Sequence, residues 1–186
     1  VTNGLVEAGL TYASAAGFST PHRLTLTVEG LLGASPALRE ERKGPRTDAP
    51  EKALEGFLRS TGLTKDQLIA RDDKKGQVWF AVIEKPGRPA AEIIAEVLEQ
   101  TIRNFPWPKS MRWGAGSLRW VRPLHSILCI LTDEAGASVV PLDVDGIQSG
   151  DTTQGHRFLS KGRFGVTSFD DYERKLKAAH VILRAD

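Results

Sequence analysis

The segment Lys109–Leu131, KSMRWGAGSLRWVRPLHSILCIL, joins a basic and aromatic half to an apolar half. Its first half carries four cations and two tryptophans, and its second half ends in the apolar run Ile127–Leu131. An apolar run of this length is typical of a buried strand. We therefore expect residues 119–131 to form one long strand, with Trp120 and Arg122 on the same face.

No acidic residue occurs between Gln100 and Thr132. Clustered cations contact phosphates, and aromatic faces stack on unpaired bases. The segment therefore predicts an RNA-binding surface, although tryptophans that only brace a turn or fill the core would produce the same pattern. The candidate RNA-binding residues of this segment are Lys109, Arg112, Trp113, Arg119 and Arg122.

A second candidate lies in GDTTQGHRF, residues 150–158. Gly150 and Gly155 have the spacing of a phosphate-binding loop of nucleotide hydrolases. However, His156 and Arg157 stand where that loop needs a lysine and a hydroxyl group. The stretch therefore argues against nucleotide hydrolysis, and we expect His156 and Arg157 to contact a phosphate of RNA.

Gly155 precedes two bulky side chains, which predicts a backbone turn with positive φ or a close approach of another segment. Such a turn would direct Arg157 outward from a fixed point. The alternative is that Arg157 pairs with Asp151 or Asp145 and only braces the loop.

The composition bounds the class of protein. The chain has 186 residues, 40% of them hydrophobic, and a formal net charge of +2, so any nucleic-acid footprint is local. The single cysteine, Cys129, lies in the apolar run and is predicted to be buried; a chain with one cysteine has no internal disulfide, which favours a reducing compartment. The scattered histidines lack metal-site spacing, and no nucleophile motif occurs, so we expect no metal ligand and no catalytic residue.

Apolar periodicity, caps and breakers predict a mixed set of elements. Helices are expected in the opening segment with a stop near Gly17, and then over about 50–60, 64–68, 89–105 and 168–180. Strands are expected over 21–32, 76–85, 119–131, 138–144 and 181–185, and residues 34–50 are expected to form a loop. Without strict alternation of strand and helix, this order indicates an α+β fold with a mixed, largely antiparallel sheet and packed helices.

Four motifs, in this order and with these spacings, resemble the beta subunit of bacterial glycyl-tRNA synthetase. They are FSTPHRLTLTVEGL, PWPKSMRWG, RWVRPLHSILCIL and GIQSGDTTQGHRFLS. The resemblance covers almost the whole chain, and SFDDYERKLKAAHVILRAD fits its end. The chain departs at His22, where the family usually has arginine. The resemblance implies that residues 1–186 are an N-terminal α+β domain cut from a longer chain, with a boundary near residues 106–110 if the domain has two lobes.

The resemblance also implies a function. The family enzyme is a hetero-oligomer whose alpha subunit carries the glycine and ATP site, whereas the beta subunit recognises glycine tRNA. The implied setting is cytoplasmic without a membrane, with ATP and magnesium used by the holoenzyme and no cofactor in this fragment. The expectation is a tRNA-contacting module of a glycine–tRNA ligase, inactive alone; the alternatives are an editing hydrolase of mischarged tRNA and a structural spacer. The N-terminal region of the family resembles the editing-type domain of the phenylalanyl-tRNA synthetase beta subunit.

Overall fold

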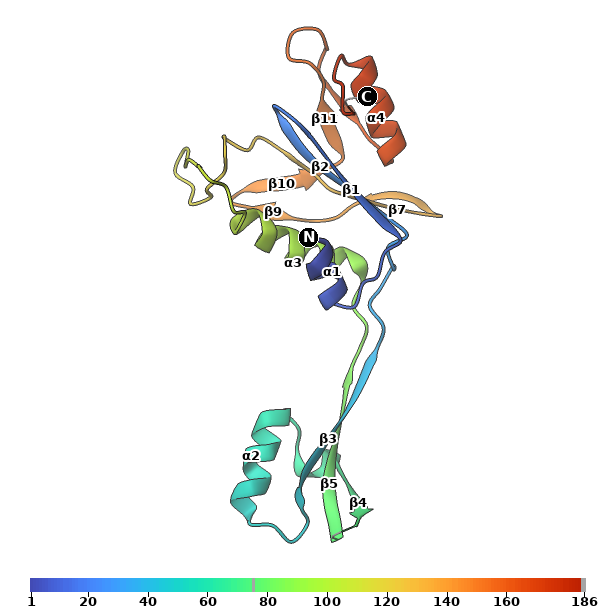
Figure 1. Ribbon diagram of the computed structural model, residues 1–186, viewed down its shortest axis with the longest axis vertical. Coiled ribbons are helices and arrows are strands. Elements are labelled where there is room, and N and C mark those ends of the chain that lie inside the picture. Colours follow the sequence, from blue (N-terminus) through green and yellow to red (C-terminus); the bar gives the residue numbers. More distant parts are fainter. Residues whose placement is uncertain (75, 185–186) are drawn as a thin grey trace. The chain divides into compact units, whose positions relative to one another are not determined.

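The computed structural model describes residues 1–74 and 76–184 and has an α+β architecture with mostly antiparallel sheets (Figure 1). The predicted α+β class with largely antiparallel pairing is thereby confirmed, although the described strands form five separate sheets rather than one. The chain divides into two compact units. The first unit combines residues 1–35 with residues 89–186, and the second unit is the continuous stretch 36–88. Residues 106–110 lie inside the first unit.

The second unit is an antiparallel sheet in the order β3-β5-β4, with one α-helix. Its elements are β3 (Leu38–Arg46), α2 (Glu51–Thr61), the 3-10 helix Lys65–Gln67, β4 (Leu68–Asp73) and β5 (Gly76–Lys85). The local signals of this unit are confirmed. Gly62 ends α2 in the left-handed conformation, and Thr64 and Gln67 form the predicted capping box.

The predicted loop over residues 34–50 was wrong, because residues 38–46 form β3 along the edge of this sheet. Charged side chains stabilise the pairing instead of apolar ones: Arg39 lies opposite Glu84, and Glu41 binds Arg71 through two hydrogen bonds. Charge on an edge strand also discourages pairing with other chains. A search for apolar alternation overlooks such a strand.

The first unit contains three α-helices and four small sheets among the described residues. Its helices are α1 (Thr2–Glu7), α3 (Ala90–Arg103) and α4 (Phe169–Ala178). Antiparallel pairs join β1 (Ser14–Thr20) to β2 (Arg23–Glu29), β7 (Ile130–Asp133) to β8 (Gly136–Val139), and β11 (Thr152–Gln154) to β12 (Arg163–Gly165). In the fourth sheet, β10 (Ile147–Gly150) pairs in parallel with β6 (Ile127–Leu128) and antiparallel with β9 (Asp143–Val144).

Two of the predicted strands are interrupted at a proline. The strand expected over residues 119–131 begins only at Ile127, because Pro123 lacks a backbone donor and the chain bends before it. Trp120 forms only an isolated bridge with Met111. The strand expected over 138–144 is likewise divided at Pro141 into β8 and β9.

Both ends of the chain also differ from the expectation. The segment around Gly17 is the strand β1, not the end of a helix. No strand occurs over the described residues 181–184, where Val181 and Leu183 instead pack against α4; residue 185 of the expected strand lies outside the described residues. The apolar run that predicted a strand here therefore reflects packing of Val181 and Leu183 against a helix.

Three clusters form the core of the first unit. Leu5, Leu10 and Ile93 join α1 to α3, whereas Tyr172 and Leu176 centre a second cluster on α4. The third cluster consists of Leu118, Leu142 and Val144, and it underlies the candidate site. Burial of Cys129 is confirmed, and this burial raises the pKa of its thiol to about 11. None of the helices described has the length and apolar character needed to cross a membrane.

Candidate nucleic-acid interface

We call residues 104–122, which follow α3, the basic loop. Its two arms meet through backbone hydrogen bonds: the Met111 N–H donates to the Trp120 carbonyl (2.8 Å), and the Trp120 N–H donates to the Met111 carbonyl (3.2 Å). Arg119 is exposed and donates from Nε to Ser110 Oγ (3.3 Å). The other predicted cations, Lys109, Arg112 and Arg122, are also exposed and form no ion pair with any described residue.

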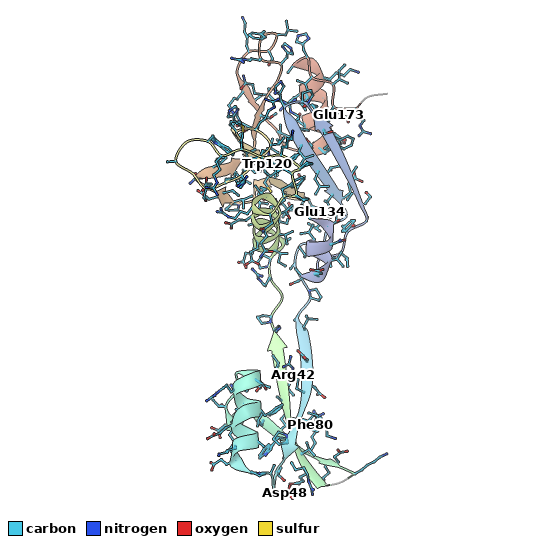
Figure 2. The ribbon with its side chains drawn as sticks, turned by 60° about the vertical axis from the view of Figure 1, so that its left-hand side comes forward. Arg42, Asp48, Phe80, Trp120, Glu134 and Glu173 are labelled. Atoms are coloured by element: carbon cyan, nitrogen blue, oxygen red, sulfur yellow. The ribbon has the colours of Figure 1, made fainter. Side chains whose placement is uncertain are left out.

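The aromatic side chains of the basic loop pack within the chain. The ring centroids of Phe105 and Trp107 lie 4.5 Å apart, and the Trp120 ring meets both edge-on at 5.2 and 5.0 Å. Figure 2 marks Trp120 among the side chains of the first unit. Trp113, a predicted RNA-binding residue, packs against the cluster of Leu118 and its neighbours. This placement favours bracing of the loop as the role of the tryptophans.

A carboxylate also holds the basic loop, at residues 117 and 118. Asp145 accepts hydrogen bonds from the Leu118 N–H (3.1 Å), the Ser117 N–H (3.4 Å) and the Ser117 hydroxyl (3.3 Å). The hydrogen bond from Leu118 is the largest cause that lowers the pKa of Asp145, and the nearby charge of Arg103 lowers it further. At Gly116, a Cβ would collide with this carboxylate.

The position of Asp145 follows from a tight hairpin. Asp145 and Gly146 both have positive φ, 56° and 84°, and they connect β9 to β10 with Val144 opposite Ile147. An Asp-Gly pair between two strands is a strong signal for this turn. The sequence therefore contained a signal for the turn but none for its contact with residues 117 and 118.

We call residues 155–162, which connect β11 to β12, the tip loop. The His156 N–H donates to the Ala179 carbonyl (2.8 Å), next to Gly155. A Cβ on Gly155 would lie 2.7 Å from that same carbonyl oxygen and 2.6 Å from Ser160 Oγ. The predicted close approach at Gly155 is confirmed, and its φ is not positive.

The predicted cations of the tip loop have different environments. His156 Nδ1 accepts from the N–H groups of Phe158 (3.3 Å) and Leu159 (3.2 Å), so its ring caps the turn. Arg157 is exposed, and its guanidinium lies 5.4 Å from the centroid of the Phe158 ring. Among the described residues, no carboxylate forms an ion pair with Arg157, which contradicts the bracing pair with Asp151 or Asp145.

The seven predicted RNA-binding residues therefore form two groups. Figure 1 shows the basic loop and the tip loop on different sides of the first unit. Sequence reasoning considered Asp145 only as a partner of Arg157 and not as a contact of the basic loop, and it did not select Phe158. Phe158 is 82% exposed, and the only sequence signal for it was its position next to His156 and Arg157. Over the described residues, no group of three or more His, Cys, Asp or Glu side chains could hold a metal ion.

Comparison with known proteins agrees with the resemblance in the motifs. The family model described as glycyl-tRNA synthetase beta subunit matches residues 1–186. The glycine–tRNA ligase beta subunits of Paracoccus denitrificans and Ruegeria sp. are 72% and 71% identical over 185 and 183 residues, which is 100% and 98% of this chain. The chain spans 27% of the length of each of these relatives. The chain belongs to the family of glycyl-tRNA synthetase beta subunits.

Proposed function

We propose that this chain is a tRNA-contacting module of a cytoplasmic glycine–tRNA ligase. It would support the ATP-dependent attachment of glycine to its tRNA in a hetero-oligomer with an alpha subunit. Family membership supports the reaction and the substrate. The observation that carries the tRNA contact is the basic loop, which exposes Lys109, Arg112, Arg119 and Arg122 without an acidic residue between Gln100 and Thr132.

The way the basic loop is held supports binding to phosphates. It is restrained at two places, by the backbone bridge between Met111 and Trp120 and by the hydrogen bonds to Asp145. Cations on a restrained loop lose less conformational freedom when they bind an anion. With a net charge of only +2, the chain has no general attraction for RNA, so a local cluster must supply it.

The test neutralises the basic loop in the full-length beta subunit assembled with its alpha subunit. Changing Arg112, Arg119 and Arg122 to Gln should weaken binding of a glycine tRNA transcript. The slope of log Kd against log salt should fall by about 0.7 for each lost single-strand phosphate contact. Glycine-dependent ATP–pyrophosphate exchange should persist, because the proposed site of that reaction lies on the alpha subunit.

The matched control removes three cations from the exposed surface of the second unit. Lys52, Arg59 and Lys65 are exposed and form no ion pair with a described residue. Their replacement by Gln changes the net charge equally and should leave the slope unchanged. An unaltered slope in the basic-loop variant, with native folding, would contradict the proposal and leave the loop a purely structural role.

We also propose that residues 1–186 alone activate no glycine, since ATP and magnesium would act on the alpha subunit. Pure, folded fragment should show no pyrophosphate exchange above a protein-free control, and measurable exchange would overturn this.

We also propose a relation of fold to the editing-type domain of the phenylalanyl-tRNA synthetase beta subunit, which the α+β architecture with mostly antiparallel sheets supports.

A further inference from the structure

The tip loop presents adjacent apolar side chains to solvent. Phe158 is 82% exposed and Leu159 is 63% exposed. Burial of an aromatic side chain lowers the free energy. Within this chain, the Phe158 side chain is not buried. The exposure is explained by a mobile loop, by contact with another protein surface or by a ligand.

The backbone contacts argue against a mobile loop. The backbone of Gly155 and His156 lies against Ala179, with a hydrogen bond of 2.8 Å. His156 Nδ1 then accepts from the N–H groups of Phe158 and Leu159, and the Ser160 N–H donates to the His156 carbonyl (3.0 Å). The main chain at Phe158 is thus held from both sides, while its ring projects outward.

The charge around the ring identifies the class of ligand. From Thr152 to Phe169 the chain has no acidic residue but has three permanent cations, Arg157, Lys161 and Arg163. Arg157 is free of ion pairs with described residues and lies beside the Phe158 ring. An apolar protein partner would not require this charge, whereas an anion with a planar apolar face requires both features. An unpaired nucleotide has that chemistry, since its base stacks on aromatic rings and its phosphate binds Arg.

We infer that the tip loop binds an unpaired nucleotide of the tRNA, with Phe158 stacked on the base and Arg157 bound to an adjacent phosphate. This inference rests on the proposed tRNA contact and adds to it a second, single-strand-specific point of contact. Paired bases in a helix do not offer a free face, so the nucleotide comes from the 3′ end or from a loop of the tRNA.

The experiment measures Kd for a glycine tRNA transcript with the full-length beta subunit assembled with its alpha subunit. Phe158→Leu keeps the site apolar but removes the aromatic face, and it should weaken binding about 5- to 100-fold. Phe158→Trp should retain affinity. The salt slope should stay unchanged in both variants, whereas Arg157→Gln should lower it by about 0.7.

The control variant is Leu38→Ala in the second unit, where an apolar side chain is 60% exposed. It should bind tRNA as the unaltered protein does. A second transcript that lacks the single-stranded 3′ nucleotides identifies the source of the base. If the effect of Phe158→Leu disappears with this transcript, the base belongs to the 3′ end; if it persists, the base belongs to a loop.

Three results would overturn the inference. The first is unaltered affinity of Phe158→Leu while neutralising the basic loop still weakens binding, which would leave the proposed function standing. The second is unaltered tRNA affinity of both Phe158→Leu and the basic-loop variant, which would contradict the proposed function as well. The third is loss of assembly with the alpha subunit while the full-length beta subunit alone binds tRNA with unaltered affinity, which would make the tip loop a protein-docking element.

Discussion

The basic loop and the tip loop have the same kind of composition but opposite arrangements. Both lack acidic residues and place cations beside aromatic side chains. In the basic loop the rings of Phe105, Trp107 and Trp120 pack on one another, whereas in the tip loop the ring of Phe158 is 82% exposed. The difference teaches that cations beside aromatic residues predict stacking on a base only where the rings face solvent, whereas exposed cations can bind phosphates without any free ring.

The two loops are also anchored differently, so mutations can test the difference between them. The tip loop depends on the absence of a side chain at Gly155, and the basic loop depends on the carboxylate of Asp145. A steric anchor fails when atoms are added to it. A hydrogen-bonded anchor fails when its charge is removed.

Gly155→Ala should have the largest effect on stability. The new Cβ would lie 2.7 Å from the Ala179 carbonyl oxygen, which is main chain and cannot rotate away. Such crowding costs about 1–3 kcal/mol of the free energy of unfolding. Urea unfolding of the variant measures this loss. Gly165→Ala is the control, because nothing lies within 4 Å of its added Cβ; equal stability of the two variants would contradict the steric anchor.

Asp145→Asn should loosen the basic loop without straining the backbone, because Asn tolerates positive φ. The amide acceptor is uncharged, so its hydrogen bonds from Ser117 and Leu118 weaken. Hydrogen exchange of the Leu118 amide should accelerate, while that of the Phe158 amide in the tip loop should not change. The control is Asp151→Asn, which removes an exposed carboxylate that forms no ion pair with a described residue. Equal protection of Leu118 in all three proteins would rule out the anchor.

The C-cap residue of the helix α4 is Ala179, which contacts the tip loop. The free energy of unfolding should depend on pH through Asp171 in this helix. The hydrogen bond from Lys175 is the largest cause that lowers the pKa of Asp171 from 3.8 to about 2. Because the folded pKa lies below the unfolded value, the ionised carboxylate stabilises the fold above pH 3.8, and this contribution is lost as the pH falls towards about 2.

Urea unfolding over this pH range tests that sign. The stability difference between the unaltered protein and Asp171→Asn should shrink as the pH falls from 3.8 to about 2. Asp170→Asn, which removes the neighbouring exposed carboxylate, is the control and should show a smaller change with pH. A difference for Asp171→Asn that stays constant with pH would refute the assignment.

Trp107→Phe should have the smallest effect. The indole Nε1 of Trp107 is buried and has no hydrogen-bond partner among the described residues, so its removal leaves no new unpaired group. Thermal stability should stay unchanged or rise slightly, and affinity for tRNA should not change. A clear loss of tRNA affinity would mean that the basic loop uses its rings in binding after all, which would break the comparison.

Local signals by themselves determined much of the secondary structure. Ser168 caps α4 by accepting from the Asp171 N–H, Gly62 ends α2, and β5 has the predicted bounds Gly76–Lys85. Each signal acts within a few residues, so the sequence contains both partners of the interaction. The order and spacing of four motifs likewise sufficed to identify the family.

Tertiary structure decided which side of each element is used. In β2, Leu24 and Leu26 are exposed, whereas the Thr25 hydroxyl lies 3.1 Å from the Tyr172 hydroxyl. Alternation predicted a strand here, but only the position of α4 determined which of its faces is covered.

The same holds for the candidate site. Asp145 contacts Ser117 across 28 residues, and Gly155 meets Ala179 from another element. The sequence shows an aromatic residue near cations at both Phe158 and Trp120, and it does not show that one ring is exposed and the other packed. Their roles differ because exposure depends on contacts between distant segments, which local propensity and spacing do not contain.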